Sequence, residues 1–272
     1  MPRPSLGSCD DLRNAQVPDV TLVGLHGFTQ TGRHWHDIMA AVHESLSALG
    51  ISAACRCPDL PGHGAAAEQS CTLDDAVATL RDLVTPGIPT VWAGYSMGGR
   101  HLLHLVAQQP ELVDAMVLIS TTAGIDDADA RAERRRLDEQ RAQEVEALGV
   151  DEFLARWTSM DMFSTMPATP DDMAERQRNT VTGLATSLRG ASTGAQQPLW
   201  SNLAGLEIDT IVLTGDLDPK FTTIGERLTS TLPHAEHRRV ADCGHALLAE
   251  APHHVVDALV DITCRRLGHP TT

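Results

Sequence analysis

The stretch at 94–98, GYSMG, places Ser96 between two glycines at a spacing that suits a nucleophile. Glycines on both sides of a serine let a strand turn sharply into a helix, which holds the hydroxyl in a strained, exposed position. The apolar run 88–93 predicts a buried strand before the serine, and a leucine-rich helical pattern follows it. We therefore predict that Ser96 is catalytic.

A serine hydroxyl is a weak nucleophile and a weak base unless a histidine takes its proton and a carboxylate orients that histidine. After a strand-to-helix serine turn, the acid and the histidine follow in that order along the chain. The turn 214–219, TGDLDP, follows a predicted strand and supplies Asp216 and Asp218. We favour Asp218 as the acid, with Asp216 stabilising the turn. His245 lies in a loop after the last predicted strand, as this order requires.

The sequence also predicts the donors of an oxyanion hole, which binds the negative charge that develops on a substrate oxygen. One backbone N–H comes from the residue after the nucleophile, here Met97, and the other from a loop after an earlier strand. Phe28 in the turn LHGF is expected to supply that second N–H. We expect His26 and His63 nearby to brace loops rather than take part in the chemistry.

Alternating strands and helices must position these residues. Apolar residues such as Ile38, Val42, Leu46 and Leu49 recur at helical spacing between the strands. Alternation implies crossover connections and therefore an α/β fold with a mostly parallel sheet flanked by helices. Short aliphatic runs predict the strands at 17–25, 51–56, 88–93, 113–120, 208–214 and 237–240.

The alternation stops between residues 121 and 207. This stretch is first polar and helical and then rich in Thr, Gly and Gln. We interpret 121–207 as an inserted helical cap, and 1–120 with 208–272 as the core. The segment SLRGASTG at 187–194 has no strand before it, which argues against a phosphate-binding loop and favours a flexible connector between cap and core.

Composition narrows the range of partners. The formal net charge of −15 argues against nucleic acids and anionic membranes. There is no apolar run of about eighteen residues and no signal-like start, so we expect a cytoplasmic protein without membrane insertion. The six cysteines lack zinc-site spacing, and we expect reduced thiols and no metal. The oligomeric state stays open, and a homo-oligomer is one outcome.

Four motifs occur in a recognisable order: LHGFTQTGRHW, DLPGHG, GYSMGGR and GDLDPKF. In this order they resemble the α/β-hydrolase superfamily over essentially the whole chain. The resemblance implies the α/β-hydrolase fold. It does not settle the reaction, because function varies widely within one fold.

Arg100 lies one helical turn after Ser96, so its side chain can stay near the pocket floor. An esterase for neutral substrates needs no cation there. The alternative is an ordinary helical arginine paired with a carboxylate of the cap.

The cap contains RAERRRLD at 131–138, FLARW at 153–157 and a long segment at 176–200. Together with GYSMGGR, these resemble the 2-succinyl-6-hydroxy-2,4-cyclohexadiene-1-carboxylate synthase family of menaquinone biosynthesis. In that family a Ser-Asp-His triad removes a proton next to a carbonyl, and pyruvate is expelled without an acyl-enzyme step. The resemblance implies a lyase that needs no metal or organic cofactor.

By that resemblance the small-molecule substrate carries three carboxylates, each bound by an arginine from a different segment. The matching positions are Arg100, Arg134 and Arg178. Trp157 matches a tryptophan that lines the pocket, and Tyr95 matches the residue beside the nucleophile. Guanidinium groups bind carboxylates through paired hydrogen bonds, so such a site would select a polyanion over a neutral ester.

Several alternatives remain open at this point. Arg135 and Arg136 could replace Arg134, since most charges in this helix should form a solvated face. Asp161 would oppose anion binding if it faced the pocket, and otherwise pairs with a cap arginine. The same triad could instead hydrolyse a small ester, thioester or carbon-carbon bond. A non-catalytic module that uses the pocket as a receptor is a further class.

Overall fold

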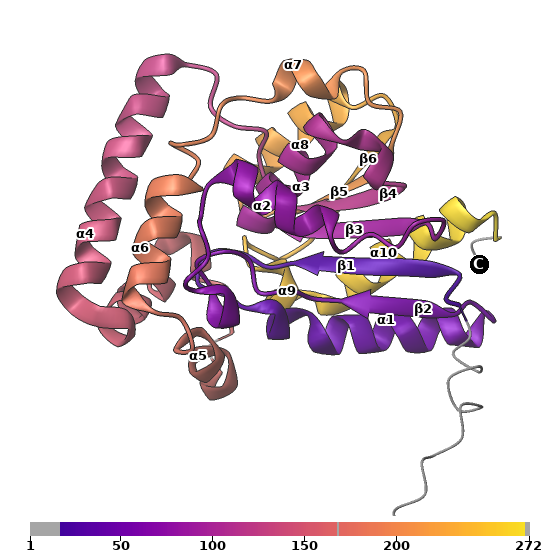
Figure 1. The fold of residues 1–272 in the computed structure, drawn as a ribbon, viewed down its shortest axis with the longest axis horizontal. Helices are drawn as coiled ribbons and strands as arrows, with labels where there is room; N and C mark the ends of the chain where they lie inside the picture. Colours follow the sequence, from indigo (N-terminus) through magenta and orange to yellow (C-terminus); the bar gives the residue numbers. More distant parts are fainter. Residues whose placement is uncertain (1–16, 168, 270–272) are drawn as a thin grey trace, which may run out of the picture.

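A computed structural model describes residues 17–167 and 169–269. A six-stranded sheet runs through the molecule in the order β2-β1-β3-β4-β5-β6, and every strand pairing is parallel (Figure 1). All six strands lie where the sequence predicts them, with ends that differ by a few residues. They are β1 (Val20–Leu25), β2 (Ala53–Arg56), β3 (Thr90–Tyr95), β4 (Ala115–Ile119), β5 (Asp209–Gly215) and β6 (Ala235–Val240).

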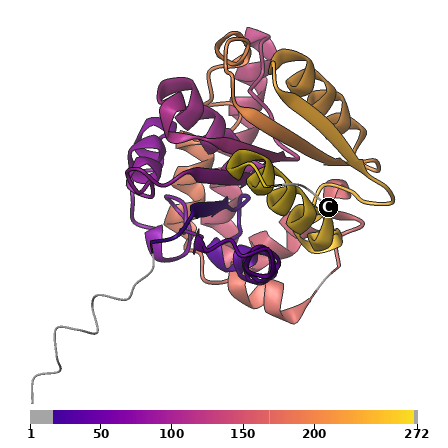
Figure 2. The same cartoon turned by 90° about the vertical axis from the view of Figure 1, so that its right-hand side faces the viewer.

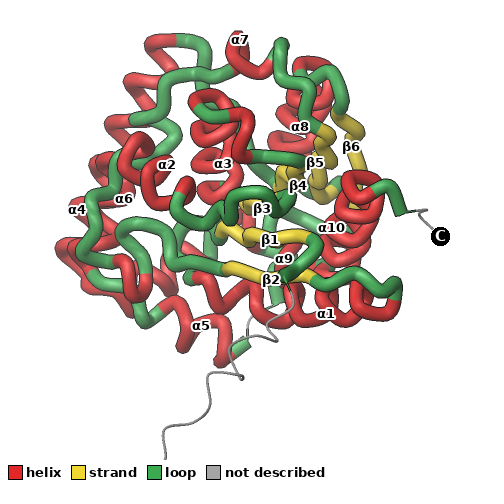
Figure 3. Tube along the Cα trace, turned by 45° about the vertical axis from the view of Figure 1, so that its right-hand side comes forward, coloured by secondary structure: helices red, strands yellow, loops and turns green. Residues whose placement is uncertain are grey.

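Helices cover both faces of the sheet (Figures 2 and 3). One face carries α1 (His36–Ala48) and α10 (Pro252–Leu267), and α9 (Leu247–Glu250) precedes α10. The other carries α2 (Leu73–Arg81), α3 (Met97–Gln108) and α8 (Pro219–Thr231). Short 3₁₀ turns lie at Gly32–Trp35, Gly64–Ala66, Pro110–Leu112 and Asp161–Phe163.

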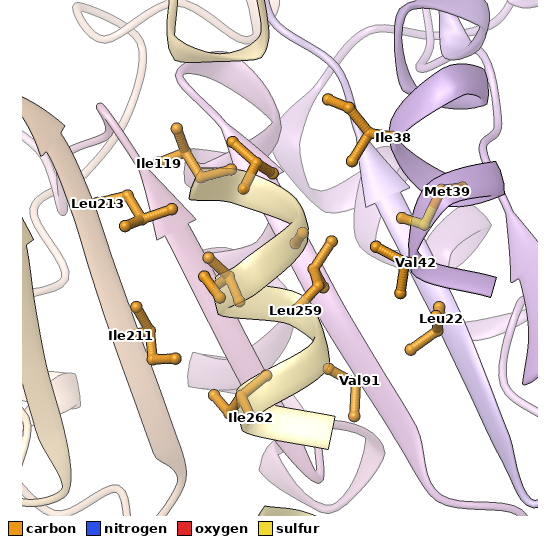
Figure 4. Close-up of a cluster of buried hydrophobic side chains, with 14 of the residues drawn as sticks. Leu22, Ile38, Met39, Val42, Val91, Ile119, Ile211, Leu213, Leu259 and Ile262 are labelled. Atoms are coloured by element: carbon orange, nitrogen blue, oxygen red, sulfur yellow. The ribbon is translucent and has the colours of Figure 1, made fainter. Parts of the chain in front are cut away.

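The core has two layers because successive strand residues point to opposite faces. In β1, Leu22 packs under α1 and α10, whereas Val23 and Leu25 pack on the α3 side. Figure 4 shows Leu259 and Ile262 of α10 lying over the strands. Strands buried on both faces read as continuous apolar runs, which is why the sequence shows them clearly.

One predicted core residue is exposed. Leu49 was expected on the apolar face of the first helix, but it is 42% exposed. The reason is that α1 ends at Ala48, and Gly50 turns the chain with φ 78. Leu49 therefore lies in the turn after α1 and not on the buried face of the helix.

The inserted segment forms four helices between β4 and β5: α4 (Ala128–Thr158), α5 (Pro170–Arg176), α6 (Val181–Gly190) and α7 (Trp200–Leu203). α4 and α6 lie side by side beyond the ends to which the strand arrows point (Figure 1). Gly149, with φ 78, breaks α4 near its end. None of the helices within residues 17–167 and 169–269 is long and apolar enough to cross a membrane.

The glycine-rich connector prediction is wrong for residues 187–190. They form the last turn of α6, where Leu188 packs against α4 in a cluster with Leu184. Leu184 and Leu188 are four residues apart and therefore lie on one face of α6. At the start of the helix, the Thr180 side chain accepts the Gly183 N–H and caps it. The core and cap boundaries stay predictions, although Trp200 already packs with the core layer under α3.

Candidate active site

Ser96 lies at the turn from β3 into α3, as the sequence predicts. Its φ of 50 and ψ of −104 are rare for a residue other than glycine. Neighbouring main chain and side chain hold this conformation: the Ser96 N–H donates to the Ile119 carbonyl at 2.8 Å, and the Thr121 hydroxyl donates to the Ser96 carbonyl at 2.7 Å. The turn therefore presents the Ser96 hydroxyl in a fixed place.

The glycines around Ser96 are needed for close approach. A Cβ at Gly94 would lie 2.6 Å from the Gly99 Cα, and one at Gly98 would lie 2.3 Å from the Leu25 carbonyl oxygen. Real side chains do not tolerate such distances, so the strand, the turn and the helix can pack this tightly only with glycine at both positions.

The three predicted triad residues come together. His245 Nε2 lies 3.2 Å from Ser96 Oγ, and His245 Nδ1 lies 2.8 Å from Asp218 Oδ2. The His245 side chain is 1% exposed and that of Asp218 is 11% exposed. Asp216 is exposed, and the carboxylate that His245 contacts is that of Asp218. An Nδ1–H bonded to Asp218 leaves Nε2 free to accept the serine proton.

Glu250 is a residue that the sequence analysis missed. Its Oε2 accepts the Gly244 N–H at 2.7 Å, and its Oε1 accepts the Ala246 N–H at 2.9 Å. One carboxylate therefore holds the main chain on both sides of His245. The only signal in the sequence is an acidic residue five positions after the histidine, which is too common to single out.

The turn that carries Phe28 is held by a buried histidine. The His26 Nε2 accepts the Leu60 N–H at 2.9 Å, so the proton is on Nδ1, which donates to the Gly27 carbonyl at 2.8 Å. That carbonyl also accepts the Gln30 N–H at 3.1 Å. Burial lowers the pKa of His26 well below its usual value, which keeps the ring neutral.

This bracing orients one predicted oxyanion donor. The peptide group between Gly27 and Phe28 is planar and trans, so its N–H points opposite to the fixed carbonyl. The Met97 N–H is the first of α3 and has no partner within the helix. Both residues line the same cavity as Ser96. His63, whose Nδ1 lies 3.2 Å from the Pro61 carbonyl, also stands in a loop and not beside Ser96.

A cavity of about 200 Å³, called the chamber below, lies between the core and the cap. Ser96 and His245 open into it, and Tyr95 and Trp157 line it, as predicted. Tyr95 is 4% exposed, and burial raises its pKa. The Trp157 indole N–H is buried and has no hydrogen-bond partner within the described residues, so it can donate to a ligand.

Cationic side chains gather in the chamber wall: Arg100, Arg134, Arg141, Arg176 and Lys220. Arg100 is 7% exposed and donates to the Ala191 carbonyl at 2.6 Å. Burial, with a further contribution from Arg134, lowers the pKa of Arg100 to about 9. The group therefore stays charged at neutral pH.

Arg134 faces the chamber, and its two neighbours do not line it. Its Nε donates to both oxygens of Asp138, at 2.8 and 2.9 Å, and Arg141 donates to the same carboxylate at 3.2 Å. Arg135 instead donates to the Gly194 carbonyl, and Arg136 pairs with Glu133 on the surface. Of these three arginines, Arg134 is the one that lines the chamber, and its role in substrate binding stays a prediction.

Arg178 does not line the chamber, contrary to the sequence prediction. Its side chain is 46% exposed and pairs with Glu175. Arg176, two positions earlier, is 3% exposed and lines the chamber. Residues two apart at a helix end point to different sides, and α5 ends at Arg176. Asp161 is exposed and is not part of the chamber wall.

Among the described residues, the titratable groups form no metal site. Within 17–167 and 169–269, no group of three or more His, Cys, Asp or Glu side chains is placed to hold a metal ion. The chemistry that the described side chains offer is proton transfer at Ser96 and His245, next to a cationic wall.

The comparisons with known proteins show to which family the chain belongs. A family model described as the alpha/beta hydrolase fold matches residues 20–252. The chain belongs to the α/β-hydrolase family. Among its relatives is the 2-succinyl-6-hydroxy-2,4-cyclohexadiene-1-carboxylate synthase of Escherichia coli O1:K1 / APEC, 30% identical over 89% of this chain and 92% of the relative.

Two further similarities extend along most of the chain. A Bacillus subtilis (strain 168) protein, provisionally named as the same synthase, is 30% identical over 85% of each chain. The solved structure of MenH from S. aureus matches with a TM-score of 0.82 and 23% identity, covering 93% of this chain and 96% of that chain. The sequence relatives support the family, and this structure supports the fold.

Proposed function

We propose that the protein is a lyase that eliminates pyruvate from an enolpyruvyl succinyl-cyclohexene carboxylate and forms 2-succinyl-6-hydroxy-2,4-cyclohexadiene-1-carboxylate. One observation carries the proposal. The hydrogen-bonded triad of Asp218, His245 and Ser96 reaches the chamber at His245 and Ser96, and the wall of this chamber holds five cationic side chains. The named synthases among the relatives support the same reaction. We propose a cytoplasmic location, consistent with a small soluble substrate.

The first step is proton abstraction. His245 Nε2 takes the proton of Ser96, and the serine oxygen removes a proton from the carbon next to the succinyl carbonyl. The electron pair moves onto the carbonyl oxygen as an enolate. The Phe28 and Met97 N–H groups would bind this negative charge, which lowers the barrier most if they are already in place.

The second step expels the leaving group. The enolate electrons return and form a ring double bond at the carbon that bears the succinyl group, the existing ring double bond shifts by one position, and the bond between the ring carbon and the enolpyruvyl oxygen breaks. The departing pyruvate enolate takes up the proton that His245 Nε2 received from Ser96 and becomes pyruvate, so the proton removed from the substrate balances the proton gained by the product. Ser96 and His245 end in their starting protonation states, and no covalent acyl-enzyme forms.

The cationic wall would bind the carboxylates of the substrate. We propose Arg100, Arg134 and Arg176 as the three arginines, with Arg176 in place of the predicted Arg178. Arg141 and Lys220 add positive charge on the side of Arg134. Each charged hydrogen bond contributes about 1.5–3 kcal/mol. Three arginine–carboxylate pairs are therefore enough to favour a polyanion over a neutral ester, even in a protein of negative net charge.

Hydrolysis of a small ester, thioester or carbon-carbon bond is the second candidate. The observation in its favour is the triad itself, whose hydrogen bonds suit acyl transfer equally well. A neutral ester makes no use of the cationic wall, and this separates the two candidates.

The test is to offer the purified protein the enolpyruvyl precursor and follow the release of pyruvate. We expect turnover by the wild type, and a loss of turnover in the matched control Ser96→Ala. Pyruvate release no faster than in this control, together with rapid hydrolysis of a neutral ester, would reject the lyase and favour the hydrolase.

A further inference from the structure

The turn that carries Phe28 contains a strained residue. Thr29 has φ 68, a left-handed conformation that is rare for a β-branched side chain. It is fully buried, with 0% exposure. Such a conformation persists only where the surroundings hold it, so the contacts of Thr29 show what keeps this turn in place.

Two buried side chains of the inserted segment hold Thr29. The Arg176 guanidinium donates to the Thr29 hydroxyl at 2.5 Å, and the Asn179 amide donates to the Thr29 carbonyl at 2.7 Å. Arg176 is 3% exposed and Asn179 is 5% exposed. Asn179 also accepts the Gly64 N–H at 3.0 Å, which fixes its amide so that the NH₂ group faces Thr29.

Residues 172–179 of the inserted segment make further contacts with the core. The Thr31 hydroxyl donates to Glu175 at 2.6 Å, and His34 Nε2 lies 3.1 Å from Asp172. Residues 172–179 therefore follow the loop 29–34 along several hydrogen bonds. Figure 1 shows α5, which begins this segment, at the lower end of the cap.

Phe28 lies between two restrained neighbours. His26 and Gln30 fix the Gly27 carbonyl from the core side, and the inserted segment fixes Thr29 from the other side. If Thr29 relaxed to an extended conformation, the peptide group between Thr29 and Gln30 would rotate and withdraw the Gln30 N–H from the Gly27 carbonyl. The peptide that carries the Phe28 N–H would then lose one of the two hydrogen bonds that fix its direction.

We propose that Asn179 is a positioning residue for the oxyanion hole, and that it acts with Arg176 by holding Thr29 in its left-handed conformation. The hole is then complete only while residues 172–179 are docked on the core. The inference rests on the proposed function, in which the Phe28 N–H binds the developing negative charge. Asn179 does not line the chamber, whereas Arg176 does, so Asn179 separates positioning from substrate binding.

The experiment compares Asn179→Ala with Thr180→Ala. Thr180 is the adjacent residue and caps α6 by accepting the Gly183 N–H at 3.0 Å, so its loss weakens the same region without touching Thr29. Two rates are measured: kcat for pyruvate release, and the labelling of Ser96 by a neutral fluorophosphonate. The phosphonyl oxygen occupies the oxyanion hole during labelling, so labelling reports on the hole without the natural substrate.

We expect Asn179→Ala to lower kcat about 10- to 100-fold, with KM within about threefold, and to slow labelling by a similar factor. Thr180→Ala should keep both rates within about threefold. Asn179→Asp is the second variant in case the alanine variant does not fold, because it can still accept the Gly64 N–H but cannot donate to Thr29. It should show the same loss.

Labelling at the wild-type rate in either Asn179 variant would overturn the positioning role. An equal loss in Thr180→Ala would also overturn it, since the effect would then be general weakening of the cap. A wild type that is labelled but releases no pyruvate contradicts the proposed function instead, and the labelling rates of the variants still decide the role of Asn179.

Discussion

The triad and the cationic wall of the chamber are built in different ways. Ser96 and His245 are placed by main-chain contacts at the ends of core strands: the serine turn is bonded to Ile119, and Glu250 holds the loop of His245. The arginines of the inserted segment sit on helices and are held by carboxylates, as Asp138 holds Arg134. On the proposed function, the triad would carry the chemistry and the cationic wall, which includes Arg100 of α3 as well as arginines of the inserted segment, would select the substrate.

Loss of the Ser96 hydroxyl should have the largest effect. Ser96→Ala removes the hydroxyl that is bonded to His245, and we expect pyruvate release to fall by about 10⁴-fold or more. Substrate binding should change little, because the cationic wall is intact. Kinetic assays of pyruvate release, with binding followed by calorimetry, measure both. A variant that keeps a tenth or more of the wild-type rate would contradict the role of Ser96 as the base.

The two arginines at the end of α5 test the cap side of the comparison. Arg176→Ala should lower kcat/KM by about 10- to 100-fold, because a buried guanidinium and its charged hydrogen bonds are lost. Arg178→Ala is the matched control and should stay within about threefold, since surface ion pairs contribute little. The reverse order of effects would show that the predicted Arg178 faces the substrate after all.

The pH dependence sharpens the role of Arg100. Its pKa is lowered to about 9, so the guanidinium is charged below that pH and loses its proton as the pH rises through it. We expect kcat/KM for the polycarboxylate to fall above about pH 9. Labelling by a neutral fluorophosphonate is the control and should show no such fall. If both rates fell in parallel, the group that titrates would belong to the triad and not to the cationic wall.

Of the four changes considered, Glu250→Gln should reduce activity least. Glu250→Gln keeps the shape but removes the charge and one of the two acceptors that hold the loop of His245. We expect kcat to fall about tenfold with KM unchanged, because a small displacement of the base slows proton transfer. A steady-state titration measures both constants. A rise in KM with unchanged kcat would contradict this role and show that Glu250 supports substrate binding instead.

Much of the core could be predicted from the sequence. Strands that are buried on both faces produce uninterrupted apolar runs, and the glycines around Ser96 mark a packing constraint that few other residues satisfy. The order of serine, acid and histidine then selected Asp218 and His245 among many candidates, and the structure brings all three together.

The cap could be predicted less well, for physical reasons. Arg176 and Arg178 are two positions apart, and which one faces inward depends on where α5 ends. The carboxylates of Asp138 in the cap and of Glu250 in the core are two of 36 acidic residues, and only the packing shows that they hold Arg134 and the loop of His245. The last turn of α6 looked like a glycine-rich linker because its apolar partner on α4 is distant in sequence.

The most direct test of the division between chemistry and selection is to measure two rates in Arg100→Ala. The account predicts that pyruvate release from the polycarboxylate falls by about 100-fold, while the fluorophosphonate still labels Ser96 within about threefold of the wild-type rate. Unchanged pyruvate release in this variant would contradict the claim that the cationic wall selects the substrate.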